Sequence, residues 1–363
     1  MASKKKIFML AGEASGDIYG GLLATHFSSS NLGPEIEMKG WGGEDMQGAG
    51  VSITKHYREL AYMGLWEVIS HLPTILRNLD TCWGEICEFK PDALVLIDFP
   101  GFNMRIAKKA RKAGIKVYQV VAPQVWAWKK GRVKDLARDY AAVFPVLPFE
   151  HDLLEKSGVN SIYCGHPLLD TLSDEDKSIQ ELDCENPILA LLPGSRKQEL
   201  KKMLPILLEV AEQFPSMTPL IAGAPGASQK LYAKSEKAGV KVVFGKTREI
   251  LRSSKLAVIT SGTATLEAAL LGTPHVLVYK TSALTYIAAK LLVKVKFIGL
   301  TNLILGKDVV PELVQTNCTV DNIQRALLSE KVNSQNESFI ELRKTLGGKG
   351  ASEKIATEIV NML

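Results

Sequence analysis

The sequence predicts an α/β protein built from two doubly wound domains. Short apolar runs rich in β-branched residues alternate with amphipathic segments along both halves of the chain, as they do where helices connect the strands of a parallel sheet. A polar, acidic stretch, Ser173–Asn186, interrupts this alternation and is interpreted as a linker. The length of 363 residues is sufficient for two hydrophobic cores.

Each domain is expected to contain its own series of strands and helices. The first domain, residues 1–172, has the predicted strands Lys6–Ala11, Glu35–Gly40, Ala93–Asp98, Lys116–Val121, Ala141–Val146 and Ser161–Gly165, with helices at Asp17–Ser28, Asn103–Ala113 and Phe149–Ser157. The second domain, residues 173–347, has the predicted strands Pro187–Leu192, Pro219–Ala222, Lys241–Phe244, Leu256–Thr260 and His275–Tyr279, with a helix at Lys197–Gln213. The segment 348–363 predicts a helix that packs back on the first domain.

Composition and charge narrow the class of protein. A hydrophobic content of 46% and a charged content of 23% are typical of a soluble globular protein. The formal net charge of +5 comes from cations spread along the chain, so an anionic substrate or membrane surface is favoured over nucleic acid. The five cysteines are odd in number and lack metal-ligand spacing, which favours reduced thiols. No signal peptide or membrane span is expected, and the prediction is a cytoplasmic protein.

A turn between a strand and a helix in the last third of the chain has the features of an anion site. The apolar run Leu256–Thr260 leads into Ser261, Gly262 and Thr263, which open a helical segment. Unpaired N–H groups and the positive end of the helix dipole favour a phosphate at such a turn. Glu267, one helical turn further on, is placed to reach the hydroxyls of an attached ribose. The alternative is an ordinary capped helix after a strand.

A second turn of the same kind lies in the same domain. Gly194 and Ser195 follow the predicted strand Pro187–Leu192, and Arg196 adds a permanent charge whose planar guanidinium suits phosphate. Two such turns predict a diphosphate held at the carboxyl edge of one parallel sheet. Neither turn has a Walker A sequence or a G-x-G-x-x-G fingerprint, which disfavours a kinase or a simple nicotinamide enzyme.

In the first domain, the strongest candidate for chemistry is Asp98. It ends the buried run Ala93–Asp98 and precedes Pro100 and Gly101, which delay the next helix. A carboxylate at that edge of an open α/β sheet lies where such sheets bind ligands. We interpret Asp98 as a general base, with capping of local N–H groups as the alternative.

Two further loops of the first domain are candidates for binding an acceptor or a sugar ring. The first predicted strand leads into a glycine-containing turn, and two tryptophans follow the strand Lys116–Val121. Tryptophan faces stack on sugars or border acyl chains, although simple packing is an equal alternative. The residues concerned are Gly12, Glu13, Ser15, Gly16, Asp17, Trp126 and Trp128.

Two apolar stripes are long for a soluble enzyme. Most such stripes face a core, and the alternative is a membrane patch whose apolar side chains insert while lysines meet anionic head groups. The first stripe comprises Leu65, Trp66, Ile69, Leu72 and Leu76, and the second runs from Leu284 to Val295 with Lys290 and Lys294 beside it. No metal site is expected, because the D-x-D-like run Asp174–Asp176 lies in the polar linker and is interpreted as a solvated loop.

Taken together and in order, these motifs resemble the lipid-A-disaccharide synthase family, which are inverting glycosyltransferases of the GT-B fold. The resemblance covers essentially the whole chain. The motifs that carry it are Ala11-Gly12-Glu13-Ala14-Ser15-Gly16-Asp17, Met63-Gly64, Asp98-Phe99-Pro100-Gly101-Phe102-Asn103, Val125-Trp126-Ala127-Trp128, Leu192-Pro193-Gly194-Ser195-Arg196, Ser261-Gly262-Thr263-Ala264-Thr265-Leu266-Glu267, Asn302-Leu303 and Glu312-Leu313-Val314-Gln315.

The resemblance implies two Rossmann-like domains that face each other across a cleft, the first binding the acceptor and the second the UDP-sugar. It implies transfer of 2,3-diacylglucosamine from UDP-2,3-diacylglucosamine to 2,3-diacylglucosamine 1-phosphate, which yields the β-1′,6-linked disaccharide 1-phosphate and UDP. It implies no cofactor and no metal. It assigns the acceptor base to Asp98 and contacts with UDP to Arg196, Ser261, Gly262, Thr263, Glu267, Asn302 and Gln315.

The implied substrates carry acyl chains, so the resemblance favours a peripheral protein on the inner face of the inner membrane and gives the apolar stripes a role. It leaves room for a homodimer. Three alternatives stay open. An undecaprenyl-linked glucosaminyltransferase or a UDP-sugar 2-epimerase would share the diphosphate sites, but is not expected to carry the motifs Asp98–Asn103 and Trp126–Trp128 together. A non-catalytic UDP-sugar sensor would not need Asp98.

Overall fold

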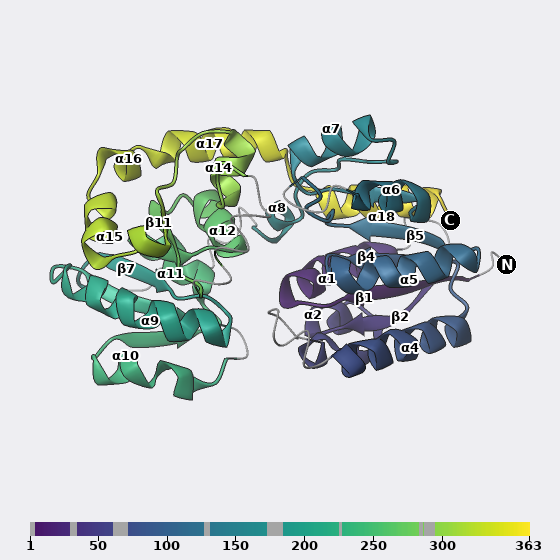
Figure 1. Cartoon of the computed structure of the whole chain (residues 1–363), viewed down its shortest axis with the longest axis horizontal. Helices are drawn as coiled ribbons and strands as arrows, with labels where there is room; N and C mark the ends of the chain where they lie inside the picture. Colours follow the sequence, from purple (N-terminus) through teal and green to yellow (C-terminus); the bar gives the residue numbers. More distant parts are fainter. Residues whose placement is uncertain are drawn as a thin grey trace. The chain divides into compact units, whose positions relative to one another are not determined.

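The computed structural model describes residues 4–29, 35–60, 72–126, 131–172, 184–224, 227–282, 286 and 295–363. The chain forms two compact units (Figure 1). The first unit contains Met1–Leu172 together with Leu346–Leu363, and the second contains Ser173–Thr345. Each unit has one parallel six-stranded sheet among its described residues, so the predicted two-domain α/β fold is confirmed.

The first unit alternates strands and helices. Its elements are β1 (Lys5–Ala11), α1 (Ala14–Phe27), β2 (Ile36–Gly42), α2 (Glu44–Gly48), β3 (Ser52–His56), η2 (Tyr57–Glu59), α4 (Leu72–Phe89), β4 (Ala93–Ile97), α5 (Pro100–Lys112), β5 (Lys116–Val120), α6 (Arg132–Asp139), β6 (Ala142–Phe144), α7 (Pro148–Lys156), α8 (Leu168–Thr171) and, from the end of the chain, α18 (Ala351–Asn361).

The second unit repeats this arrangement. Its elements are β7 (Ile188–Leu192), α9 (Lys197–Glu212), β8 (Thr218–Gly223), η4 (Gln229–Tyr232), α10 (Ala233–Lys237), β9 (Lys241–Phe244), α11 (Thr247–Ser253), β10 (Ser254–Thr260), α12 (Thr263–Leu271), β11 (His275–Tyr279), α14 (Leu300–Leu305), β12 (Glu312–Val314), η5 (Gln315–Asn317), α15 (Val320–Leu327), α16 (Glu330–Asn333) and α17 (Gln335–Leu346).

Both sheets have the Rossmann strand order. The first is ordered β3-β2-β1-β4-β5-β6, and the second, β12-β11-β10-β7-β8-β9, has the same order when its strands are counted from β7. The strands read as continuous apolar runs because helices cover both faces of each sheet. In β4, for example, Leu94 and Leu96 belong to one core cluster, whereas Val95 and Ile97 belong to the cluster on the opposite face.

Helix α18 returns to the first unit and completes one of its cores. It packs against α1 and is the yellow helix among the purple and teal elements of that unit (Figure 1). Its apolar face contributes Ile355, Ala356 and Ile359 to the core beneath α1. The carboxylate of Asp170 accepts hydrogen bonds from backbone N–H groups at the start of α18, the shortest being 2.6 Å from Gly350. These N–H groups have no partner within the helix, so Asp170 stabilises its first turn.

The structure departs from the predicted strands at three places. Two of the four edge strands, β3 and β12, were not predicted, because they are short and none of their residues is fully buried. The predicted strand Ser161–Gly165 is wrong, since it forms only one isolated bridge, from Ser161 to Val143. Beyond that bridge the Tyr163 hydroxyl donates to the carbonyl of Leu346, the last residue of α17, at 3.1 Å.

Candidate active site

The strand order of each sheet reverses at one point, between β1 and β4 in the first unit and between β7 and β10 in the second. Ligands of open α/β sheets bind beyond the carboxyl ends of the strands at such points. In the first unit, the turn after β1 and Asp98 after β4 lie there. In the second unit, Gly194–Arg196 follow β7 and Ser261–Thr263 follow β10. The four predicted turns therefore occupy the ligand-binding edge of their own sheets.

Asp98 lies in a turn whose backbone is strained. Asp98 and Phe99 both have a left-handed conformation with φ of 48°, which is uncommon for residues other than glycine. Two buried amides hold this turn. The Asp98 carbonyl accepts hydrogen bonds from Nδ2 of Asn103 at 2.7 Å and from Nε2 of Gln119 at 3.2 Å. Strain that is fixed by buried polar side chains is common at functional sites, so the turn is a candidate functional feature.

The surroundings of Asp98 favour a basic carboxylate. Burial raises its pKa above the usual range, whereas a hydrogen bond with the Phe99 backbone lowers it. A raised pKa makes the ionised carboxylate a stronger base. The Phe99 ring lies against Gly12, where an added Cβ would come within 2.4 Å of the ring. The turn after β1 therefore keeps a glycine at residue 12 so that Phe99 and Asp98 can take this position.

The predicted binding residues of the first turn have different roles. Asp17 is 1% exposed, and its carboxylate accepts hydrogen bonds from three backbone N–H groups at the start of α2, the shortest being 2.6 Å from Gly43. Asp17 thus connects α1 to α2, and the structure does not support its predicted contact with a substrate. Gly16 is buried, whereas Glu13 and Ser15 are partly exposed at the start of α1.

One residue at this edge was not singled out from the sequence. Glu150, the third residue of α7, is 3% exposed, and Nε1 of Trp126 donates to its Oε1 at 2.8 Å. Burial raises the pKa of Glu150 to about 7, and the nearby charge of Asp98 raises it as well. The sequence signal was available, since Glu150 follows the third consecutive strand end, after those of Asp98 and Trp126.

In the second unit, helix α12 begins with an open N-terminus. It starts at Thr263 after Gly262, and both residues are exposed. No side chain among the described residues caps this helix end, while the Thr265 hydroxyl donates to the carbonyl of Gly262 at 2.8 Å and closes the first turn. Exposed N–H groups at the positive end of a helix dipole are suited to a phosphate.

In the turn after β7, a carboxylate of the same chain occupies the N–H groups that were predicted to bind phosphate. The Glu199 carboxylate accepts hydrogen bonds from the backbone N–H groups of Ser195 at 3.2 Å and Arg196 at 3.3 Å. Gly194 has φ of 100°, and a Cβ there would come within 2.5 Å of that carboxylate. The N–H groups predicted to bind phosphate therefore hold a carboxylate of the same chain. The Arg196 guanidinium is 51% exposed and contacts Glu199 at 3.2 Å, so this turn presents a positive charge to solvent.

Two other residues predicted to contact UDP, Glu267 and Gln315, also contact protein groups through their side chains. The Glu267 carboxylate forms an ion pair with Nε of Arg248 at 2.6 Å, which orients it on α12. Gln315 has a left-handed backbone with φ of 54°, and its side-chain oxygen accepts a hydrogen bond from the N–H of Thr281 at 3.3 Å. Its Nε2 is buried and makes no hydrogen bond with the described residues. Gln315 thus retains an unused donor.

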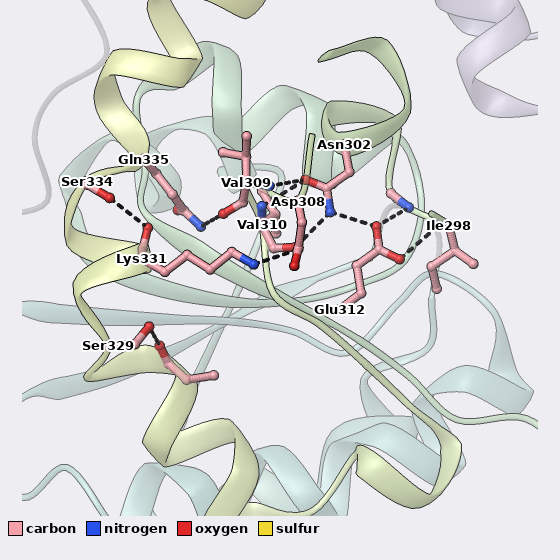
Figure 2. A network of polar contacts seen from close by, with 12 residues as sticks. Ile298, Asn302, Asp308, Val309, Val310, Glu312, Ser329, Lys331, Ser334 and Gln335 are labelled. Carbon is pink, nitrogen blue, oxygen red and sulfur yellow. Dashed lines mark hydrogen bonds and ion pairs between the residues drawn. The ribbon is translucent and has the colours of Figure 1, made fainter. Parts of the chain in front are cut away.

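Asn302 is part of a polar network inside the second unit (Figure 2). It is fully buried, and Nδ2 donates to the carbonyl of Val310 and to Oε1 of Glu312, both at 2.8 Å. Its Oδ1 accepts hydrogen bonds from the N–H groups of Val309 at 2.9 Å and Val310 at 2.8 Å. These four bonds use the full capacity of an asparagine amide. The structure therefore does not support the predicted contact between Asn302 and UDP, and assigns this side chain to the loop before β12.

Several predictions fall outside the described residues. Of the first apolar stripe, Leu72 and Leu76 are described, with exposures of 46% and 50%. No described helix is long and apolar enough to cross a membrane. Among the described residues, no three His, Cys, Asp or Glu side chains lie close enough together to hold a metal ion. The predicted residues outside the described ranges are Leu65, Trp66, Ile69, Trp128, Asp174–Asp176 and most of the second stripe, Lys290 and Lys294 included.

Comparisons with known structures identify the class of fold. A UDP-GlcNAc 2-epimerase from Neisseria meningitidis bound to UDP-GlcNAc covers 99% of this chain and 100% of its own with a TM-score of 0.68 and 11% identity. A spinosyn forosaminyltransferase covers 99% of this chain and 98% of its own with a TM-score of 0.60 and 15% identity. At these identities the likeness concerns the fold alone. The fold is GT-B, with two Rossmann-like domains in one chain.

Sequence comparisons identify the family. The family model of lipid-A-disaccharide synthetase matches residues 7–359. A lipid-A-disaccharide synthase of Geobacter metallireducens is 36% identical over 100% of this chain and 98% of its own length. The lipid-A-disaccharide synthase of Syntrophus aciditrophicus is 35% identical over 99% of this chain and 98% of its own length. That of Myxococcus xanthus is 33% identical over 100% of this chain and 99% of its own length.

The fold and the family together define a UDP-sugar-dependent glycosyltransferase. The chain belongs to the lipid-A-disaccharide synthase family, as the motifs predicted, and it acts in the formation of the lipid A disaccharide.

Proposed function

We propose that this enzyme transfers 2,3-diacylglucosamine from its UDP conjugate to the 6-hydroxyl of 2,3-diacylglucosamine 1-phosphate, with inversion and without a metal. Asp98 accepts the proton of that hydroxyl while the hydroxyl oxygen forms a bond to the anomeric carbon of the donor. The bond from this carbon to the diphosphate breaks on the opposite face, and UDP leaves with the electron pair. One carboxylate base suffices for such a displacement.

The developing negative charge on UDP is assigned to groups of the second unit. The open N-terminus of α12 at Gly262 and Thr263 offers backbone N–H groups, and the exposed Arg196 guanidinium offers a permanent positive charge. Glu267, oriented by Arg248, is proposed to accept hydrogen bonds from the ribose. Gln315 is proposed as an additional donor because its Nε2 is unused among the described residues.

The observation that carries the proposal is the fixed turn at Asp98. Its strained backbone, held by Asn103 and Gln119, sets a carboxylate of raised pKa at the switch point of the first sheet. A residue that only capped local N–H groups would not need such a support. We therefore choose Asp98→Asn as the test, since asparagine keeps the shape, tolerates the left-handed backbone and has no basicity.

Asp98→Asn is expected to lose about 10²–10⁴-fold in turnover, which is the usual contribution of a general base. Turnover is measured as UDP released from both lipid substrates, with mass spectrometry of the disaccharide product. UDP affinity from calorimetry and the melting temperature are expected to stay at parental values. Asp152→Asn, an exposed carboxylate on α7, is the matched control. Near-parental turnover of Asp98→Asn would remove Asp98 from the mechanism.

We further propose that the enzyme binds the membrane surface through α4. Leu72 and Leu76 are exposed on this helix, and Leu76 contributes to a surface pocket of about 330 Å³. The pocket combines an apolar wall with a cationic rim, as a surface that meets anionic lipid requires. Its lining residues are Leu76, Leu79, Asp80, Arg105, Lys108, Lys109 and Lys112.

A further inference from the structure

Polar groups follow the carboxyl ends of three neighbouring strands and lie at the same edge of the first sheet. Asp98 follows β4, Trp126 lies beyond β5, and Glu150 follows β6. The indole Nε1 of Trp126 donates to Oε1 of Glu150 at 2.8 Å, and Phe149 packs edge-on against the same indole with ring centroids 5.2 Å apart. The Glu150 carboxyl is therefore fixed in place.

The burial of Glu150 is unusual for a glutamate. Carboxylates in the first turn of a helix are normally exposed, and a buried carboxylate without charge compensation takes up a proton. Glu150 is 3% exposed, and its Oε2 is buried without a hydrogen-bond partner among the described residues. A protonated carboxyl carries an O–H at one oxygen and still accepts the Trp126 hydrogen bond at the other.

The charge that acts on Glu150 comes from Asp98. Burial and the Asp98 charge raise the pKa of Glu150, while hydrogen bonds from Trp126 and the Leu147 backbone lower it, and the balance lies at about 7. Asp98 is thus a charged group whose ionisation favours a proton on Glu150. When the surroundings of two carboxyl groups give them different pKa values, the group with the higher pKa stays protonated and the other acts as the base.

We propose that Glu150 is the protonated partner of Asp98 in a carboxyl pair, a positioning residue that leaves a single negative charge, on Asp98, to face the acceptor hydroxyl. The inference rests on the proposed role of Asp98 as the base. Before transfer the pair holds one proton, on Glu150. When the acceptor oxygen attacks, its proton moves to Asp98, so the pair holds two protons, and one returns to water after UDP has left. Ionisation of Glu150 would place a second negative charge beside the phosphate-bearing acceptor and repel it.

The test is the pH dependence of kcat/KM. In the parent enzyme kcat/KM is expected to fall by about tenfold or more between pH 7 and pH 9, as Glu150 ionises. Glu150→Gln keeps the acceptor for Trp126 but cannot ionise, so this alkaline limb should be absent. Trp126→Phe removes the hydrogen bond that lowers the pKa of Glu150, so the limb should move to higher pH. A residue with a purely structural role would leave the shape of the profile unchanged.

Two controls separate the possible failures. Asp152→Asn, on the same helix, should retain the parental profile, which also accounts for titration of the substrate phosphates. UDP affinity and melting temperature establish that each variant is folded, and Trp126→Phe decides the question if Glu150→Gln does not fold. An alkaline limb that persists unchanged in Glu150→Gln would overturn the inference. If Asp98→Asn turns over normally, the proposed base is wrong, and that outcome is independent of the pH profile of Glu150→Gln.

Discussion

Arg196 is an exposed cation in the turn after β7, where we propose that the diphosphate binds. Glu199 holds one side of its guanidinium at 3.2 Å, which orients the remaining donors toward solvent. Arg196→Ala is expected to weaken UDP binding by roughly 1.5–3 kcal/mol, the cost of one charge-assisted hydrogen bond. Calorimetry of UDP binding checks this, and Arg196→Lys should fall between parent and alanine because it keeps the charge but loses the planar fork. UDP affinity that is equal in all three proteins would place Arg196 outside the site.

For Asn302 we expect a loss of stability rather than a loss of UDP affinity. Asn302→Ala removes four hydrogen bonds and leaves the N–H groups of Val309 and Val310 buried without partners, at about 1–3 kcal/mol for each unsatisfied group. The variant should therefore melt at a lower temperature, while UDP affinity measured well below that temperature stays near the parental value. A large loss of UDP affinity with unchanged melting would restore the direct contact that the resemblance implies.

These residues show what sequence patterns can resolve at this scale. Asp98, Gly194 and Ser261 each follow an apolar strand, so their position at a ligand-binding edge could be predicted. Glu150 also follows a strand end, but it lies in the first turn of an ordinary amphipathic segment, and its burial is evident only from the tertiary structure, in its contact with Trp126. Asn302 was assigned through the family resemblance, but the hydrogen bonds that occupy it come from a loop whose path the sequence does not reveal.

At the scale of elements, α4 carries a prediction about the membrane. Leu72→Ser with Leu76→Ser should reduce sedimentation with anionic liposomes by about tenfold, because each leucine that inserts contributes on the order of 1 kcal/mol or more. The fold should be retained, since both side chains are exposed. Leu328→Ser with Ile340→Ser, two exposed apolar residues of the second unit, is the control. Equal liposome binding by both double variants would contradict a role of α4 at the membrane.

The edge strands explain where prediction of elements stops. Central strands such as β4 and β10 are recognisable because burial on both faces requires continuous apolar runs. All four edge strands pair on one side only, but β6 and β9 have apolar runs and were predicted, whereas β3 and β12 have no fully buried residue. Their sequences therefore follow no apolar period, and their strand conformation depends on pairing with β2 and β11.

At the scale of the whole molecule, each unit contains one buried histidine among its described residues. His166 in the first unit and His275 in the second are 3% and 0% exposed, and burial lowers the pKa of each from 6.5 to about 4. Between these values the unfolded chain binds a proton that the folded chain excludes. The free energy of unfolding should therefore fall as the pH drops from 6.5 to 4, by up to about 3 kcal/mol for each histidine.

Urea unfolding between pH 7.5 and pH 4.5 measures this dependence. His275→Gln keeps a polar side chain in the second unit but cannot take up a proton, so the stability of that unit should depend less on pH than in the parent. A pH dependence equal to that of the parent would show that His275 does not contribute.

The return of α18 to the first unit has a consequence for synthesis. A nascent chain builds the second unit from one continuous segment, Ser173–Thr345, which leaves the ribosome before α18 does. The first unit begins earlier but cannot close the core beneath α1 until Ile355, Ala356 and Ile359 have emerged. Although domains generally fold in the order of translation, the first unit here is completed last. Until then the part of this core that α18 covers is open to chaperones and to aggregation.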